Sequence, residues 1–266
     1  KGYTPASLAD VSVPGFDDSS ASNWMWTYDL TDDQVASAAA GYATAASWMS
    51  AFSGQGYAVA TGNVPMINKL LYDKIPTTDV RKGWWLDENL HSPLLANLEW
   101  KDSKGNVLAK GDAIAPLKIK DVKEPLVAYA NVKFGMKSGV GSSKNNNSWP
   151  LMRVEEMYLI KAEGEAMSNN PNAKQTLENF VKTYRNPDYT CTASSAQEMQ
   201  DEIWLQRRME LWGEGFALFD ILRLKKPIIR KDTNYEAKVQ FNLEPESQIM
   251  IYRIPQCEME TNNGIK

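Results

Sequence analysis

Two glutamates near the end of the chain, Glu210 and Glu214, have the spacing of a catalytic carboxylate pair. Four residues apart on a helix, their Cβ atoms would lie about 5–6 Å from one another, a separation compatible with glycoside hydrolysis. Arginines at 207, 208 and 223 accompany them. Because a nearby cation keeps a carboxyl group ionised, these arginines disfavour the raised pKa that a general acid needs. Such clusters also occur in structural ion-pair networks. We favour that interpretation and assign no catalytic residue.

Two further arginines lie close to an acidic residue. Asp79 precedes Arg81 by two positions, and Glu156 follows Arg153 by three. We interpret both as ion pairs at helix ends or between helices, not as clamps for a substrate.

Other catalytic and metal-binding groups are scarce. His91 is the only histidine, which excludes histidine metal clusters and nucleophiles activated by an imidazole. The two cysteines, Cys191 and Cys257, are too few for a disulfide framework or a structural zinc site; a single disulfide or two buried thiols would both fit them. The chain has no glycine-rich phosphate loop and no dinucleotide fingerprint. We therefore predict no metal site and no cofactor.

Aromatic residues are abundant where catalytic groups are not. The chain has 9 Trp, 11 Tyr and 7 Phe, and six of the tryptophans lie in the first hundred residues. Trp48, Tyr57 and Trp84 flank glycine-rich or charged turns, where a large ring has less reason to be buried. A sugar ring stacks on such an exposed aromatic face. Trp24 and Trp26 fit either a surface of this kind or the core. The predicted ligand-binding residues are Trp48, Tyr57, Trp26, Trp24 and Trp84.

Short elements are expected to carry these rings. Large side chains at every second position over 24–28 predict a strand with one committed face. Thr31 is the predicted N-cap of an alanine-rich helix over 35–49. Polar residues between two apolar steps over 100–107 predict a hairpin. The low-complexity run 138–148 predicts a mobile surface loop.

The second half of the chain has the pattern of packed helices. Apolar or small residues recur every four positions over 154–166 and at helical spacing over 177–184, and turn residues between them predict an antiparallel pair. Gly164 costs about 1 kcal/mol relative to alanine inside a helix. We expect close helix approach to compensate for it, as in tetratricopeptide-like pairs. Ser195 and Glu198 form a predicted capping box.

Length and charge limit the class of protein. A chain of 266 residues, 43% of them hydrophobic, buries a core as one large domain or two small ones. Its net charge of -4 gives no electrostatic case for nucleic acid, and no apolar run reaches the length that crosses a bilayer. The abrupt start at Lys1-Gly-Tyr predicts a fragment of a longer protein.

Four segments, in order along the chain, resemble the motifs of one family. Segment 72–81 contains Pro-x-x-Asp-Val-Arg, and segment 151–163 contains Arg-x-x-Glu-x-Tyr-Leu-x-x-Ala-Glu. Segment 202–223 has paired arginines, a Met-Glu-Leu step, a Glu-Gly pair and a closing Phe-Asp-x-x-Arg, and segment 254–262 starts with Ile-Pro. Together they resemble the SusD/RagB family, the surface nutrient-binding lipoproteins of Bacteroidetes-type bacteria.

The resemblance implies a mainly α fold: a SusD-like α/α scaffold with tetratricopeptide-like helix pairs and minor β hairpins. Residues 1–266 would be the C-terminal portion of a SusD-like domain, with the family motifs over about 72–262 and candidate ligand loops within 1–71. The missing N-terminal half of the same protein would supply the lipid-anchored cysteine and most of the helices. Because the family places some ligand contacts upstream of its Asp-x-Arg element, Trp48 and Tyr57 rank first among the aromatic candidates.

The implied function is capture of an oligosaccharide or other nutrient at the surface of the outer membrane. The ligand would pass to a SusC-like TonB-dependent transporter. This protein would be no enzyme and would need no cofactor, although some relatives carry a calcium ion. Two alternatives stay open: a glycoside hydrolase that uses paired carboxylates, and a tetratricopeptide-type adaptor that binds peptide termini.

Overall fold

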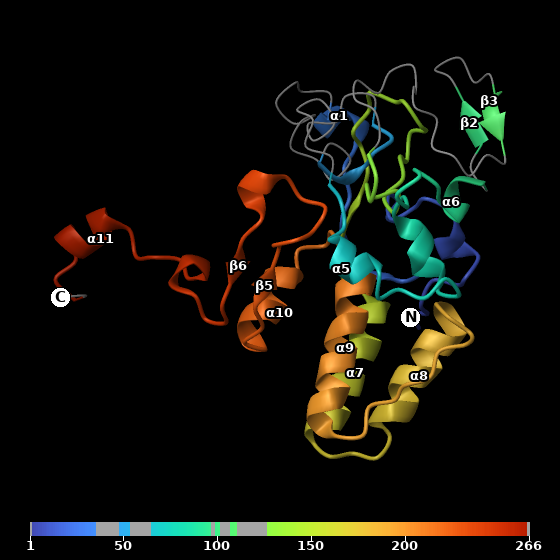
Figure 1. Cartoon of the computed structure of the whole chain (residues 1–266). Coiled ribbons are helices and arrows are strands. Elements are labelled where there is room, and N and C mark those ends of the chain that lie inside the picture. Colours follow the sequence, from blue (N-terminus) through green and yellow to red (C-terminus); the bar gives the residue numbers. More distant parts are fainter. Residues whose placement is uncertain are drawn as a thin grey trace. The chain divides into compact units, whose positions relative to one another are not determined.

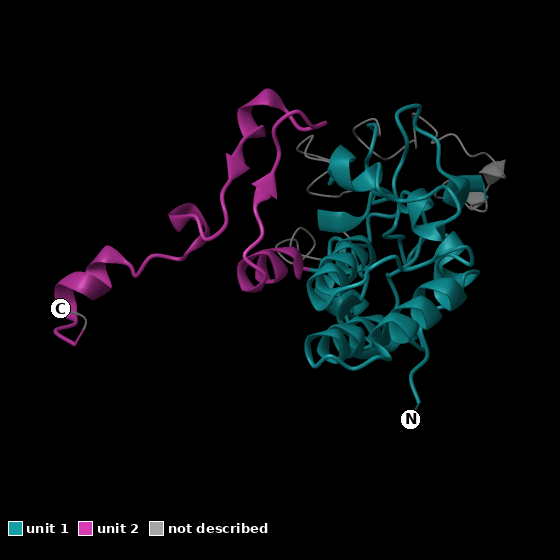
Figure 2. Cartoon of the chain, turned by 60° about the horizontal axis from the view of Figure 1, so that its bottom comes forward, with its two compact units in different colours: residues 1–214 teal, residues 215–266 magenta. Residues whose placement is uncertain are grey.

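The computed structural model describes residues 2–35, 48–53, 65–96, 99–101, 107–110 and 127–264, with the backbone alone over 99–101 and 107–110. It divides into two compact units, residues 1–214 and 215–266 (Figures 1 and 2). The described elements are mainly helical with a few short strands, which confirms the predicted fold class. Tyr57 and most of the predicted alanine-rich helix lie outside the described residues.

Short elements make up the first part of the first unit: η1 (Asp10–Ser12), β1 (Trp24–Tyr28), α1 (Asp32–Val35), α5 (Lys69–Tyr72), η2 (Val80–Trp84) and α6 (Pro93–Ala96). β1 pairs antiparallel with β4 (Trp149–Arg153). β2 (Glu99–Lys101) pairs antiparallel with β3 (Val107–Lys110). This second pair is the predicted hairpin.

Three longer helices complete the first unit: α7 (Val154–Met167), α8 (Ala173–Tyr184) and α9 (Ala196–Glu210). α7 packs against both α8 and α9 (Figure 1), so the predicted helix pair is confirmed. The predicted capping box begins α9: Ser195 Oγ accepts from Glu198 N, and the Glu198 carboxylate accepts from Ser195 N. The expected close approach at Gly164 is wrong, because a Cβ atom there would meet no atom within 4 Å.

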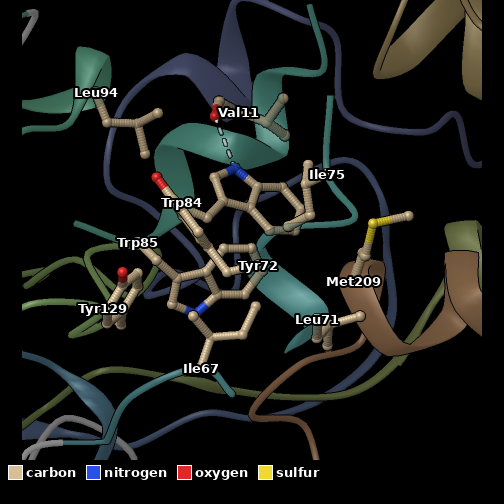
Figure 3. Packing of buried hydrophobic residues seen from close by; sticks show 10 residues of the cluster. All are labelled: Val11, Ile67, Leu71, Tyr72, Ile75, Trp84, Trp85, Leu94, Tyr129 and Met209. Carbon is tan, nitrogen blue, oxygen red and sulfur yellow. Dashed lines mark hydrogen bonds between the residues drawn. The ribbon is translucent and has the colours of Figure 1, made fainter. Parts of the chain in front are cut away.

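The core of the first unit contains two buried tryptophans side by side. Trp84 and Trp85 are both 0% exposed, and their rings lie 6.1 Å apart. Around them pack side chains from η1, α5, α6, α9 and the loops between elements (Figure 3): Val11, Ile67, Leu71, Tyr72, Ile75, Leu94, Tyr129 and Met209. Burial of rings this large is a main source of stability. A separate apolar cluster holds α7, α8 and α9 together.

The predicted surface loop 138–148 is wrong for its last four residues. Residues 145–148 are between 0% and 7% exposed. The amide of Asn147 accepts a hydrogen bond from Lys137 N through Oδ1 (3.0 Å) and donates one to Gly135 O from Nδ2 (2.9 Å). An asparagine side chain both donates and accepts. A run of such residues can therefore be buried when main-chain groups satisfy it.

The second unit consists of short elements: α10 (Ala217–Arg223), β5 (Ile228–Ile229), η3 (Ala237–Val239), β6 (Asn242–Leu243), η4 (Gln248–Met250) and α11 (Gln256–Thr261). β5 and β6 pair antiparallel. Cys257 lies on α11 and is exposed, whereas Cys191 of the first unit is buried. Among the described helices, none combines the length and the apolar character that a membrane crossing requires.

Candidate functional site

Strand β1 presents two large rings to solvent. Trp26 is 63% exposed and Tyr28 is 52% exposed, whereas Trp24 on the same strand is 6% exposed. A regular strand would place all three side chains on one face, as the sequence predicts. The pairing with β4 instead shifts register between Trp24 and Trp26, and again between Trp26 and Thr27. Such bulges re-aim side chains, and the predicted face is divided into a buried and an exposed part.

Strand β4 adds further apolar surface beside these rings. Trp149 lies directly opposite Tyr28 in the antiparallel register, and side chains at opposed positions share a face. Trp149 is half-buried, and Leu151 is 42% exposed. We call this surface, made of Trp26, Tyr28, Trp149 and Leu151, the aromatic ribbon.

The segment that carries Trp48 is anchored to the core. Trp48 itself is 46% exposed, but Ala51 and Phe52 are 1% and 0% exposed. The main-chain oxygen of Met49 accepts a hydrogen bond from Asn131 Nδ2 (3.0 Å). The ring of Trp48 is thus held at the surface by a segment whose neighbouring side chains are fully buried.

Residues 145–148 form hydrogen bonds with both segments that carry exposed rings, the one after β1 and the one that contains Trp48. The hydrogen bonds run from Ser148 Oγ to Asp29 Oδ1, from Asn146 Nδ2 to Asp32 Oδ1, and from Ser53 Oγ to Asn145 Oδ1. The first two hold the chain that leaves β1, and the third holds the segment of Trp48. One buried polar run therefore supports the exposed rings on two segments that are distant in sequence.

The remaining predicted site residues are placed differently. Trp84 is 0% exposed, and its Nε1 donates to Val11 O at 3.0 Å in the core. Trp24 is also buried. Neither ring has a face open to a ligand in this structure, so both act in packing. Tyr57 lies outside the described residues. Of the five predicted residues, Trp26 and Trp48 are the ones that the structure exposes.

A second polar feature lies beneath the surface, and we call it the buried charge cluster. It has four cationic and four anionic side chains, each at most 3% exposed: Arg81, Lys133, Arg153, Arg185, Asp79, Glu155, Glu210 and Glu214. Equal numbers of opposite charges make it neutral as a whole. A buried charge is tolerated when it is paired and hydrogen-bonded.

Glu210 is the centre of this cluster. Its carboxylate accepts from Arg185 Nε and Nη2, both at 2.8 Å, and from Arg153 Nη1 at 3.2 Å. Burial alone would raise the pKa of Glu210, but Arg185, Arg153 and Arg81 outweigh it, so that the pKa lies well below its usual range. The carboxyl group stays ionised and has no proton to give.

Glu214 is equally saturated. Its two oxygens accept from Arg153 Nε at 2.7 Å and Nη2 at 2.8 Å, and from Lys133 Nζ at 2.6 Å. Lys133 also donates to the main-chain oxygens of Glu210 and Trp212. Burial raises the pKa of Glu214, and the attraction of Arg153 and Lys133 reverses this, so the pKa is lowered. The interpretation of Glu210 and Glu214 as members of a structural network is confirmed, but the cations that hold them are Arg81, Arg153, Arg185 and Lys133, whereas the sequence predicted Arg207, Arg208 and Arg223.

The pairing inside the network differs in part from the sequence prediction. Arg81 does pair with Asp79, at 2.7 Å. Arg153, however, contacts Glu155 at 3.0 Å, while Glu156 faces Arg207 at 3.6 Å. Neighbouring residues at the start of α7 point to different sides of the helix. A spacing of three residues therefore did not identify the partner.

The aromatic ribbon is a described surface that exposes large rings to solvent. Exposed rings of tryptophan and tyrosine offer flat faces on which the C–H face of a sugar packs. Tyr28 and Trp149 are not among the ligand-binding residues that the sequence predicts. The pattern of 24–28 contained the relevant signal, but the bulges that turn Trp26 and Tyr28 outward depend on the register with β4 and cannot be read from β1 alone.

Comparison with known proteins identifies a family to which the chain is similar. The model of the SusD family matches residues 119–265. No curated protein matches the chain significantly.

Solved structures share the fold at low sequence identity. One is a SusD-like carbohydrate-binding protein from Bacteroides vulgatus, with 24% identity and a TM-score of 0.64, matched over 97% of this chain and 51% of that one. Another is a SusD superfamily protein from the same species, with 18% identity and a TM-score of 0.65, over 97% of this chain and 48% of that one. A third is surface glycan-binding protein A from Bacteroides thetaiotaomicron, with 18% identity and a TM-score of 0.51, over 99% and 55%. The chain therefore spans about half the length of these structures.

Proposed function

Because the chain belongs to the SusD family, as its motifs predict, we propose that it takes part in binding a glycan at the aromatic ribbon. The observation that carries this proposal is the exposure of Trp26 and Tyr28 on strand β1, where hydrogen bonds from a buried polar run hold the chain that follows the strand. Rings that stay exposed on a fixed support lose little conformational entropy when a ligand stacks on them.

The wider role of the protein extends this proposal. The glycan would be captured at the cell surface, with the protein anchored to the outer membrane by a lipid, and would pass to a SusC-like TonB-dependent transporter. Family membership and the similarity to proteins described as carbohydrate-binding and glycan-binding support this role. The chemistry is stacking and hydrogen bonding, for which no cofactor is required.

Turnover of the glycan is disfavoured by the state of the two carboxylates that could perform it. Glu210 and Glu214 are buried, ionised and saturated by arginine and lysine donors. A glycosidase needs one carboxyl group with a raised pKa that faces the glycosidic oxygen. We therefore propose binding without hydrolysis.

The test is a comparison of single substitutions in an affinity assay. The protein is run through gels that contain individual polysaccharides, and the retained ligand is then titrated by calorimetry. Trp26→Ala, Tyr28→Ala and Trp48→Ala should each weaken binding by about three- to tenfold, because each removes a stacking face worth roughly 0.5–1.5 kcal/mol. Tyr252→Ala, an exposed tyrosine of the second unit that is 93% exposed, is the matched control and should leave affinity unchanged.

Two results would count against the proposal. If the two ribbon variants and Trp48→Ala all bind every retained polysaccharide as the parent does, the ribbon is not the site. If incubation with the polysaccharide releases reducing ends, the protein is an enzyme and binding alone does not describe it.

A further inference from the structure

A cleft of about 890 Å³ lies in the first unit, and no residue of the aromatic ribbon lines it. Its walls come from α5, from residues 77–83 and from residues 87–94, with Tyr129 beside them. The volume falls within the range of clefts that hold small ligands. It is a separate place where a polar molecule could bind.

Two tyrosines of this cleft are buried without using their hydroxyl groups. Tyr72 and Tyr129 are each 8% exposed, and their rings pack edge to face at 5.3 Å. Neither hydroxyl has a hydrogen-bond partner among the residues that the structure describes. Figure 3 shows the two phenolic oxygens on the same side of the paired tryptophans. Both oxygens are open to the cleft, so the two unused hydroxyls are available to a ligand.

Both hydroxyl groups keep their protons. Burial, together with the nearby Asp87 carboxylate, raises the pKa of Tyr72 to about 12. Burial also raises the pKa of Tyr129. A neutral phenol can donate one hydrogen bond and accept others. The cleft therefore offers two groups that can bond either an amine or a hydroxyl of a ligand.

The basic side chains at the cleft already have partners. Lys82 Nζ donates to Tyr72 O at 2.7 Å and lies 3.6 Å from the centre of the Tyr72 ring. Lys69 Nζ pairs with Asp73. Arg185 belongs to the buried charge cluster and is 0% exposed. An anionic ligand would have to displace one of these contacts.

Two carboxylates at the cleft are open by contrast. Asp87 accepts from the main-chain N–H groups of Asn89 and His91 through Oδ1 alone, both at 2.8 Å. Glu88 is exposed and has no hydrogen bond to any residue of the described chain. The groups open to a ligand are thus the carboxylates of Asp87 and Glu88 and the hydroxyls of Tyr72 and Tyr129.

We propose that this cleft binds an amino sugar through its protonated amine. The ammonium group would lie against Asp87 and Glu88, since N–H bonds to a carboxylate are stronger than bonds between neutral groups. The phenols of Tyr72 and Tyr129, with the hydroxyls of Thr77 and Thr78, would bond the sugar hydroxyls. This site does not depend on the proposed function of the aromatic ribbon.

The experiment titrates the whole protein with glucosamine, N-acetylglucosamine, glucose and lysinamide at pH 7, followed by NMR shifts or calorimetry. Glucosamine should bind at least about tenfold more tightly than N-acetylglucosamine or glucose, because the last two lack the charged amine. Added salt should weaken its binding. Equal binding of the three sugars, binding of lysinamide without glucosamine, or no binding of glucosamine would each overturn the proposal.

Substitutions locate the site. Glu88→Gln keeps the shape of an exposed side chain and should weaken glucosamine binding about three- to tenfold, and Asp87→Asn should act in the same direction. Tyr129→Phe removes one hydroxyl and should cost about threefold. Glu244→Gln, an exposed glutamate of the second unit, is the control, and Trp26→Ala should bind glucosamine as the parent does. Unchanged affinity in both Glu88→Gln and Tyr129→Phe would refute the assignment, whatever Asp87→Asn does to the local turn.

Discussion

Strand β4 joins two regions of the first unit that differ in burial and in charge. At its end, Arg153 is 1% exposed and contacts Glu155, Glu210 and Glu214. At its start, Trp149 lies half-buried opposite the exposed ring of Tyr28. One strand therefore carries a closed set of charges at one end and an open apolar surface at the other.

The two regions also differ in where the family motifs lie. Arg81, Arg153, Glu210 and Glu214 lie inside the motif segments, and all of them belong to the buried charge cluster. Loss of one buried partner leaves an uncompensated charge, which is strongly destabilising. A solvent-exposed ring carries no such penalty. The motifs thus contain residues that stabilise the fold, and the rings that we propose for binding lie outside the motifs.

Removal of the central carboxylate, that of Glu210, should have the largest effect on stability. Glu210→Gln should lower the free energy of unfolding by about 3–5 kcal/mol, because it leaves three buried arginines with too few negative partners. Trp26→Ala should change it by less than about 0.5 kcal/mol, as expected of a surface substitution. Urea unfolding followed by circular dichroism measures both.

An exposed ion pair supplies the control for charge alone. Lys182 pairs with Glu178 on α8 at 3.4 Å, and the lysine is 42% exposed. Glu178→Gln would also replace the charged acceptor of Cys191 N by a neutral one, so Lys182→Gln is the cleaner variant and should cost about 0.5 kcal/mol or less. If Glu210→Gln cost no more than Lys182→Gln, the cluster would not be the frame that we describe.

Acid should act on the buried charge cluster by protonating its carboxylates. Glu210 and Glu214 have pKa values below the ordinary value of 4.5. A depressed folded-state pKa contributes stability that is complete above the unfolded value and is lost as the pH falls below it. We therefore expect the free energy of unfolding to fall as the pH drops below about 4.5.

Asp17 should make the protein less stable as the pH rises, and it should do so at a higher pH than the two glutamates. Burial and the neighbouring Asp18 raise its pKa from 3.8 to about 6. Its contribution is complete below 3.8 and is lost as the pH rises through 6. Unfolding of the parent and of Asp17→Asn at a series of pH values separates the two effects. An Asp17→Asn variant that gains no stability relative to the parent as the pH rises from 4 to 7 would contradict the second.

The buried asparagine run supports the segments that carry the exposed rings and has an intermediate expected effect. Asn147→Ala leaves Lys137 N and Gly135 O without their side-chain partner, and should cost about 1–3 kcal/mol. Ser143→Ala, an exposed position in the same loop, should cost almost nothing. If Asn147→Ala had little effect on stability, the prediction of a mobile surface loop over 138–148 would hold for these residues too.

Local patterns predicted much of the fold, whereas the site depended on long-range pairing. The helix pair α7 and α8, the capping box at Ser195 and the β2–β3 hairpin follow from spacing and turn chemistry within a few residues. The outward turn of Trp26 depends on a register with residues more than a hundred positions away. The burial of 145–148 depends on partners such as Gly135 and Asp29, which a count of polar residues does not reveal.

A substitution at Gly164 should have the smallest effect, and it should stabilise the fold. It lies inside α7, yet a Cβ atom there would meet nothing within 4 Å, and it has no left-handed backbone angle. Alanine restricts the unfolded chain and favours the helix, so Gly164→Ala should raise the free energy of unfolding by about 0.5–1 kcal/mol. Polysaccharide affinity should not change, since α7 carries none of the ribbon residues. Gly213→Ala is the contrasting variant, because its φ of 79° and a Cβ position 2.6 Å from Met49 Cε predict destabilisation. A loss of stability in Gly164→Ala would mean that another element packs closely on this face of α7.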